Sequence, residues 1–319
     1  MDLKDLVLDL RPFKPIIPVW TGHSQTVLGH LIPSDKILKT FEKHTLTLAD
    51  GDQLLLKYKN NNSKFTLSVY HGLGGNADSD YMRRSANLGL QLGWNVVLVN
   101  HRLASNEVKA SKSYHSGRGE DAEAVLDWCK EKFIDSKQVA IGFSMSGSIL
   151  LNLLARRSGK RSPDYAIVVN APLKLESASK LLTKNFSKIY DIRFYLMLKK
   201  IVQSQDSIKL PFIGSTMDID DIYTSLKNGF KDRHDYYHQC SSWAYLNQIN
   251  TPLFVLSSED DPFVDIETYR TAHWPNQAHI TISKFGGHMG YIDKLKSADF
   301  GRRWLDHYLM TVMKKITNL

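Results

Sequence analysis

One serine in this sequence stands where a nucleophile is expected. Ser144 lies in the run Gly142–Gly147, which reads GFSMSG. The apolar run Val139–Ile141 precedes it, and the apolar run Ile149–Leu151 follows it. A G-x-S-x-G-type pattern between a strand and a helix exposes the serine hydroxyl at a strained corner, above the positive end of the helix dipole. We therefore predict that Ser144 is a nucleophile; the alternative is a serine that only caps the helix.

A serine hydroxyl is a poor nucleophile at neutral pH, so it needs a base within reach and an acid that orients the base. In this architecture the partners follow in the order Ser, Asp, His, each after a strand. The run Leu253–Ser257 leads into Asp260 and Asp261, and the run His279–Ser283 leads into a glycine-rich loop that contains His288. We predict His288 as the base and favour Asp261 over Asp260 as the acid, because Asp261 directly precedes a proline that closes the turn. Taken singly, the acids are typical of a solvated turn and the histidine of an ordinary loop.

Acyl transfer also needs two donors for the oxyanion of its intermediate, each commonly worth about 3 kcal/mol. One is the backbone N–H after the nucleophile, which belongs to Met145. The other comes from the loop His71–Gly75, where we favour the amide of Leu73 because glycines flank it. The alternative is a simple strand-to-helix connection; the loop lacks the lysine of a phosphate-binding P-loop. Ser146 and Ser148 fall inside the predicted helix, where we expect them to bond back to a carbonyl or to pack.

The elements that must position these residues alternate between strand-like and helix-like patterns from about Phe41 onward. This alternation favours an α/β fold with a mostly parallel central sheet flanked by helices. Asp50 and Gly51 between two apolar runs predict a hairpin turn. The other predicted elements are strand Phe65–Tyr70, helix Tyr81–Leu92, strand Asn95–Val99, helix Glu120–Phe133, strand Tyr165–Asn170, strands Leu253–Ser257 and His279–Ser283, and a closing helix near Ala298–Met313. A chain of 319 residues suits one domain, residues 1–319.

Between Pro172 and about Thr251 the alternation breaks down. We interpret residues 173–250 as a lid inserted into the domain, because an insertion after a strand lies over the ligand crevice; the alternative is an extension of the core helices. Between Lys174 and Lys209, basic residues alternate with bulky apolar ones at helical spacing. This pattern predicts either peripheral contact with an anionic membrane or a lid whose apolar side covers an acyl pocket, and we favour the second.

The bulk composition excludes several classes of protein. The formal charge of +8 comes without a nucleic-acid-binding motif, so we expect a mildly basic surface and no nucleic-acid partner. No apolar stretch approaches the roughly 18 residues of a membrane span. The first residues mix both charges and lack a secretory cleavage site, and Cys129 and Cys240 suggest no disulfide framework, so we expect a cytoplasmic protein. No metal-binding spacing is present, and we predict neither metal nor cofactor.

The sequence is similar to the YheT-like α/β-hydrolases, a bacterial branch of a group whose eukaryotic relatives include lipid-acting esterases. The matching segments are Gly22–Thr26, His71–Gly75, Tyr114–Gly117, Asn170–Pro172, Asp235–Tyr237 with Cys240 and Ser241, Asp260–Phe263 and Phe285–Gly290. The resemblance implies an α/β-hydrolase fold, a charge-relay set of Ser144, Asp261 and His288, and hydrolysis of short- to medium-chain carboxylic esters. Relatives usually carry glycine where this chain has Ser146. The larger side chain leaves open how closely the strand and the helix pack at the corner that carries Ser144.

Two alternatives to this activity stay open. One is a lipid-ester hydrolase, either a monoacylglycerol lipase or a phospholipase, that acts at a membrane surface. The other is a catalytically silent α/β-hydrolase fold that binds a small molecule or a partner.

Overall fold

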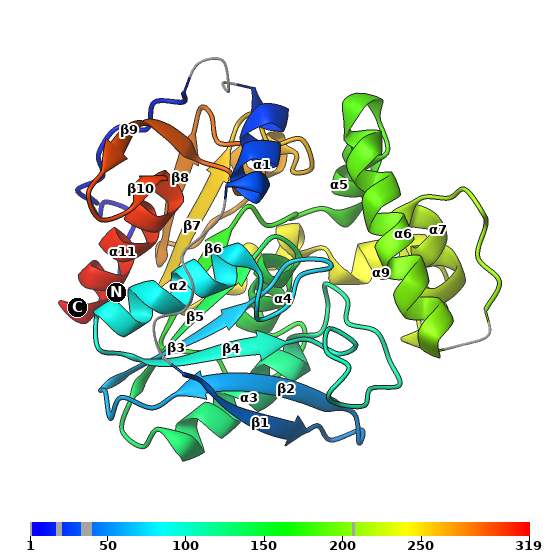
Figure 1. The fold of residues 1–319 in the computed structure, drawn as a ribbon, viewed down its shortest axis with the longest axis horizontal. Helices are drawn as coiled ribbons and strands as arrows, with labels where there is room; N and C mark the ends of the chain where they lie inside the picture. Colours follow the sequence, from blue (N-terminus) through cyan, green and yellow to red (C-terminus); the bar gives the residue numbers. More distant parts are fainter. Residues whose placement is uncertain (1, 17–20, 33–39, 206–207) are drawn as a thin grey trace.

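The computed structural model describes residues 2–16, 21–32, 40–205 and 208–319. Within these ranges the chain forms a mixed sheet in the order β1-β2-β4-β3-β5-β6-β7-β8 (Figure 1). Its strands are β1 (Glu42–Thr47), β2 (Gln53–Lys59), β3 (Phe65–Tyr70), β4 (Asn95–Asn100), β5 (Lys137–Phe143), β6 (Tyr165–Val169), β7 (Leu253–Ser258) and β8 (Ala278–Ser283). β2 pairs antiparallel with β1 and β4, and the other pairs are parallel. The predicted α/β fold with a mostly parallel sheet is confirmed.

Helices cover both faces of the sheet, because successive side chains of a buried strand point to opposite faces. In β5, Ala140 packs into one apolar cluster together with residues of α3 (Gly119–Lys132) and α4 (Met145–Leu154). Its neighbours Val139 and Ile141 pack into the other, against α2 (Asp80–Gln91) and α11 (Trp304–Thr317). The central strands of the sheet are thus buried on both sides, whereas the edge strands β1 and β8 are partly exposed.

The segment between β6 and β7 is helical. Figure 1 shows α5, α6 and α7 grouped together at one side of the molecule. The elements of the segment are α5 (Leu175–Leu182), η1 (Asn185–Ser187), α6 (Lys188–Gln205), α7 (Thr216–Ile219), the π-helical turn η2 (Asp220–Thr224), α8 (Ser225–Lys227), α9 (Arg233–Cys240) and η3 (Ser242–Gln248). Tyr195, Val202 and Tyr223 form a small apolar cluster of their own inside it. This is the segment that we interpret as a lid.

Further elements were not expected from the sequence. Helix α1 (Gly22–Leu31) precedes the sheet, a short helix α10 (Ile266–Arg270) follows β7, and β9 (Ile292–Ser297) pairs with β10 (Gly301–Arg303) before the last helix. The predicted closing helix near Ala298–Met313 is therefore wrong at its start, since α11 begins at Trp304. Gly301 has a φ of 55°, a conformation that belongs to a turn and interrupts a helix.

Candidate active site

Ser144 occupies the corner between β5 and α4. Its φ is 51° and its ψ is −120°, a conformation that is rare for a residue with a side chain. Two glycines allow the chain to turn so sharply. A Cβ atom at Gly142 would lie 2.5 Å from the carbonyl oxygen of Ser146, and one at Gly147 would lie 2.6 Å from the Cβ of Ala171. The corner therefore projects the Ser144 hydroxyl from the end of the strand, at the N-terminus of α4.

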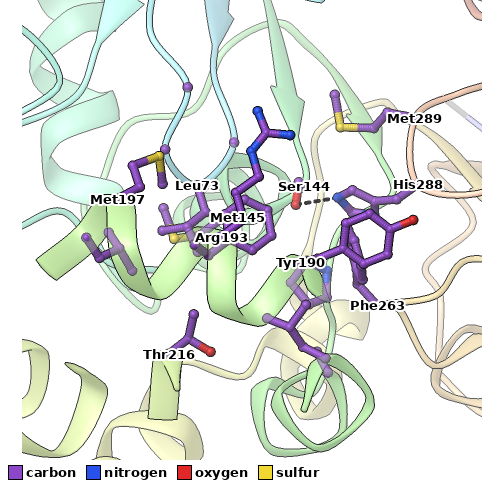
Figure 2. A pocket seen from close by; sticks show the side chains of 18 of the residues that line it. Leu73, Ser144, Met145, Tyr190, Arg193, Met197, Thr216, Phe263, His288 and Met289 are labelled. Carbon is purple, nitrogen blue, oxygen red and sulfur yellow. Dashed lines mark hydrogen bonds between the residues drawn. The ribbon is translucent and has the colours of Figure 1, made fainter. Parts of the chain in front are cut away.

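The structure brings Ser144, His288 and Asp261 into one chain of contacts. The Nε2 atom of His288 lies 2.9 Å from the Oγ of Ser144, the contact drawn as a dashed line in Figure 2. On the other side of the ring, Nδ1 lies 2.9 Å from one carboxylate oxygen of Asp261 and 3.2 Å from the other. In this geometry the imidazole can take the serine proton while the carboxylate fixes its tautomer and orientation.

Asp261 is held from several sides. Its Oδ1 accepts hydrogen bonds from the backbone N–H groups of Phe263 at 2.8 Å and Val264 at 3.1 Å. Its Oδ2 accepts one from the side-chain amide of Asn170 at 2.7 Å. The hydroxyl of Tyr291 donates to the Oδ1 of Asn170 at 3.0 Å and so fixes which way that amide points. Sequence reasoning assigned no role to Asn170, although it lies in a segment shared with the family.

The neighbouring acid, Asp260, bonds to the backbone of the histidine loop and not to the imidazole ring. Its Oδ1 accepts a hydrogen bond from the backbone N–H of Gly287 at 2.9 Å, which anchors the loop just before His288. Burial raises the pKa of Asp260 above its ordinary value. Of the two acids that the sequence left open, Asp261 contacts the imidazole and Asp260 holds the backbone that carries it.

Helix α1 supports this histidine loop, which the sequence gave no reason to expect. The backbone N–H of His288 donates to the Oγ1 of Thr26 at 2.8 Å, and that hydroxyl donates in turn to the carbonyl of Gly22 at 2.7 Å. The side-chain amide of Gln25 bonds to both backbone groups of Ile292, at 2.6 and 3.1 Å. The available signal was the family segment Gly22–Thr26, which forms the first half of α1.

The glycines of α1 let the helix backbone touch the site loops directly. A Cβ atom at Gly22 would overlap the carbonyl oxygen of Asp260, at 1.6 Å. A Cβ atom at Gly29 would lie 2.6 Å from the Cα of Gly290. A side chain at either position would push α1 away from the acid loop or the histidine loop.

The loop after β3 passes beside Ser144. A Cβ atom at Gly72 would lie 3.1 Å from the Cβ of Ser144. The amide of Gly72 donates to the hydroxyl of Tyr81 at 3.0 Å, and the amide of Gly74 donates to the hydroxyl of Tyr114 at 2.7 Å. Burial raises the pKa of Tyr81 to about 12, so its hydroxyl stays protonated at neutral pH. The backbone amides of Gly72 and Gly74 therefore already donate hydrogen bonds to tyrosine hydroxyls, and Leu73 lies between them in the sequence.

The two predicted oxyanion donors lie at the edge of the same cavity as Ser144. Leu73 and Met145 both line it, and Figure 2 shows them close to the Ser144 hydroxyl. Among the described residues, no hydrogen bond from either backbone amide is present. Backbone amides of cavity-lining residues that have no internal acceptor are suited to bind a developing oxyanion.

Ser146 links the corner to the loop after β3. Its hydroxyl donates to the carbonyl of His71 and lies 2.7 Å from the Nε2 of His101, which accordingly carries the proton. The Nδ1 of His71 bonds to the carbonyl of Gly72 at 2.8 Å, and its Nε2 accepts from the backbone N–H of His101 at 3.2 Å. Burial lowers the pKa of His101 to about 4 and holds the pKa of His71 well below its ordinary value. Both rings are therefore neutral; the His71 ring donates and accepts in this buried network, and the His101 ring donates to Ser146.

Both helix serines are buried and pack against neighbouring segments, which is one of the two behaviours expected of them. Ser146 and Ser148 do not bond back to α4; the hydroxyl of Ser148 donates to the carbonyl of Pro172 at 2.6 Å. A serine instead of glycine at position 146 is accommodated because its hydroxyl finds partners on neighbouring loops.

A cavity of about 680 Å³ opens beside Ser144 and His288. Helix α6 forms one wall, and Figure 2 shows Tyr190, Arg193 and Met197 approaching the site from it. Met197 packs so closely on the loop after β3 that a Cβ atom at Gly74 would collide with its side chain. A cavity of this size, with a lining that is mostly apolar in area but also contains polar and charged side chains, is typical of a small-molecule site. Among the described residues no group of three or more His, Cys, Asp or Glu side chains is arranged to hold a metal ion.

The fold and this corner serine define the chain as an α/β-hydrolase. The chain is 31% identical over 287 residues to YheT of Escherichia coli (strain K12), a protein named as a presumed esterase, and the match covers 85% of this chain and 84% of YheT. The chain therefore belongs to the YheT-like family of α/β-hydrolases, as the resemblance predicted.

The chain is also similar to a more distant curated relative, and solved structures of low identity share its fold. Phospholipase ABHD3 of Bos taurus is 26% identical over 308 residues, which cover 88% of this chain and 73% of that protein. An esterase of Pyrococcus furiosus has the same fold, with a TM-score of 0.62 at 16% identity over 98% of this chain and 99% of that one. An esterase of Exiguobacterium antarcticum has a TM-score of 0.55 at 15% identity, over 88% of this chain and 100% of that one. No family model matches the chain.

Among the described residues, no helix is long and apolar enough to cross a bilayer.

Proposed function

We propose that the protein hydrolyses carboxylic esters through an acyl-enzyme on Ser144. The observation that carries the proposal is the continuous contact from Ser144 Oγ through the His288 ring to the Asp261 carboxylate. Such an arrangement makes an alcohol oxygen reactive at neutral pH, because the base removes its proton and the acid orients the base.

The first half of the proposed reaction acylates the enzyme. Ser144 Oγ attacks the carbonyl carbon while His288 Nε2 takes the hydroxyl proton, and the carbonyl oxygen becomes an oxyanion. The amides of Leu73 and Met145 stabilise that oxyanion. When the intermediate collapses, the bond to the alcohol oxygen breaks and His288 returns its proton to the leaving alcohol.

The second half releases the acid. A water molecule attacks the acyl carbon while His288 takes one of its protons, and the bond to Ser144 Oγ then breaks as His288 protonates that oxygen. The carboxylate of Asp261 orients the ring and stabilises the imidazolium in both halves. The products are an alcohol and a carboxylic acid, and neither metal nor cofactor takes part.

Labelling tests this proposal most directly. A fluorophosphonate should modify Ser144 covalently, and mass spectrometry of the digested protein should locate the adduct there. Ser144→Ala should abolish both labelling and ester hydrolysis, whereas Ser105→Ala, which removes a serine hydroxyl in a loop away from the corner, should change neither. Well-folded protein that takes no label would instead support a catalytically silent binding protein.

We propose short- to medium-chain acyl esters as substrates, with the helical segment 173–250 acting as a lid over the acyl chain. Lipid esters are the second candidate, favoured by the apolar α6 wall of the 680 Å³ cavity. The likeness to relatives named phospholipases points the same way. A chain-length series separates the two candidates, since each additional buried methylene adds about 0.8 kcal/mol. A rate optimum beyond about eight carbons that rises with interfacial area favours the lipid ester.

A further inference from the structure

Helix α6 is apolar on three sides, and only two of them are covered. Tyr190, Phe194 and Met197 face the cavity. Tyr195 and Val202 belong to the small cluster inside the helical segment. A soluble surface helix normally buries one apolar stripe and turns a polar face to water.

The third side of α6 is exposed to solvent. Ile189, Ile192 and Leu196 follow one another at intervals of three and four residues, so they form one stripe along the helix. All three side chains are exposed. Single exposed apolar residues are ordinary, but a contiguous stripe on one helix face marks an interaction surface.

The loop that follows α6 adds two further apolar side chains. Phe212 and Ile213 are 90% and 82% exposed. The loop is held in place, because the carbonyl of Pro211 accepts hydrogen bonds from the Tyr195 hydroxyl and from the Nζ of Lys199, the latter at 2.6 Å. The Nζ of Lys199 also lies 5.7 Å from the centre of the Phe212 ring. These contacts tie the loop to α6 at Lys199, which is one turn from Leu196. We call Ile189, Ile192, Leu196, Phe212 and Ile213 together the α6 patch.

The exposed charges on helix α6 itself are of one sign. Within α6, whose residues 188–205 are all described, the exposed charged side chains are the cationic Lys188, Arg193 and Lys200, and Lys199 is half-buried. The single acid of this helix, Asp191, is buried and accepts hydrogen bonds from the amide and hydroxyl of Thr216, at 2.9 and 2.6 Å. Bulky apolar groups rimmed by lysine and arginine are the combination that binds an anionic lipid surface.

We propose that the α6 patch docks the protein onto an anionic membrane surface. The apolar side chains enter the boundary between headgroups and acyl chains, and the cationic rim contacts lipid phosphates. Helix α6 also lines the cavity at Ser144, so docking places the wall of this cavity at the membrane, where apolar molecules concentrate. Binding of this kind needs no hydrolysis, and it can be measured apart from the proposed reaction.

Vesicle binding tests the proposal. The protein carries Ser144→Ala, so that lipid hydrolysis cannot alter the vesicles. Flotation should recover it with vesicles of phosphatidylcholine and phosphatidylglycerol, much less with phosphatidylcholine alone, and less as salt is added. The further changes Phe212→Ser and Ile213→Ser should weaken binding by at least about tenfold, because two apolar anchors are lost. Ile134→Ser is the matched control, since Ile134 is 78% exposed but lies outside the patch.

Three results would overturn the proposal. Equal binding to the neutral and the anionic vesicles would show that the cationic rim does not contribute to docking, which contradicts a preference for an anionic surface. Binding that survives the loss of Phe212 and Ile213, or that falls equally in the Ile134 control, would place the contact elsewhere. Self-association that the Phe212 and Ile213 changes abolish, with no vesicle binding, would show that a second copy of this chain covers the patch.

Discussion

The backbone N–H of His288 donates a hydrogen bond to the Oγ1 of Thr26, although the two residues are 262 positions apart. The imidazole that faces Ser144 is thus carried on a loop whose position depends on helix α1. Thr26 does not contact the reacting atoms; it is a positioning residue.

Replacing Thr26 tests this support. Thr26→Val keeps the shape of the side chain but removes the hydroxyl, so we expect kcat to fall by about tenfold or more as the histidine loop loses its register. Thr26→Ser keeps the hydroxyl and should restore most of the rate. Steady-state kinetics on a soluble ester, at a temperature where all variants are folded by circular dichroism, measure the effect. Equal losses in the two variants would show that the Thr26 methyl group, and not its hydroxyl, matters.

The two neighbouring acids should differ sharply when each is changed to asparagine. Asp261→Asn removes the charge behind His288 and favours the wrong ring tautomer, which lowers kcat by about four orders of magnitude in hydrolases of this kind. Asp260→Asn keeps an oxygen that can accept from the amide of Gly287, so the rate should change by less than about tenfold. Parallel kcat measurements decide, and a larger loss in Asp260→Asn would reverse the assignment.

Changes at Ser146 should weaken stabilisation of the transition state more than binding of the substrate. Ser146→Ala and Ser146→Gly remove the hydroxyl that joins His71 and His101, and with it the hold on the loop that carries Leu73. We expect kcat to fall by about tenfold or more with little change in KM, because an oxyanion donor acts mainly in the transition state. Affinity for a trifluoromethyl ketone, which forms the oxyanion on the enzyme, should fall in parallel.

Ser148→Ala is the matched control for that experiment, because Ser148 is a buried serine of the same helix that bonds to the Pro172 carbonyl instead. It should lower the free energy of unfolding without a selective loss in kcat. If Ser146→Ala changes only stability, the network is structural and the loop does not depend on it.

The buried histidines predict how stability responds to pH. His101 has a folded pKa of about 4, lowered by burial, whereas an unfolded chain binds the proton near pH 6.5. Between these two pKa values the unfolded state binds more protons than the folded state. The contribution of His101 to the free energy of unfolding is therefore fully present above about pH 6.5 and is lost as the pH falls toward 4, by about 3 kcal/mol in all. Chemical denaturation between pH 7 and pH 4 measures this slope.

His101→Gln removes that titrating group and keeps a donor for Ser146. The variant should be less stable at pH 7 but should lose less of its free energy of unfolding on acidification. An unchanged slope would mean that other groups, such as His71 and the buried His115, account for the acid sensitivity.

Much of the fold follows from local pattern. The hairpin at Asp50 and Gly51 and the strands that lead to Ser144 and His288 lie within a residue or two of their predicted bounds, since apolar runs and glycine turns are short-range signals. The start of α11 was wrong because Gly301–Arg303 pair with a strand that has too few apolar residues to be recognised. The order of serine, acid and histidine after three strands was enough to nominate the site, because parallel strands bring their carboxyl ends to one edge.

The sequence by itself determined the elements, their order and the residue types that can do chemistry, because each depends on neighbours within a few positions. Only the tertiary structure decided which acid faces His288, where Ser146 sends its hydroxyl, and that α1 holds the histidine loop. These outcomes depend on the direction of single side chains and on contacts between segments that are dozens to hundreds of residues apart. Packing fixes such contacts, and no local pattern encodes them.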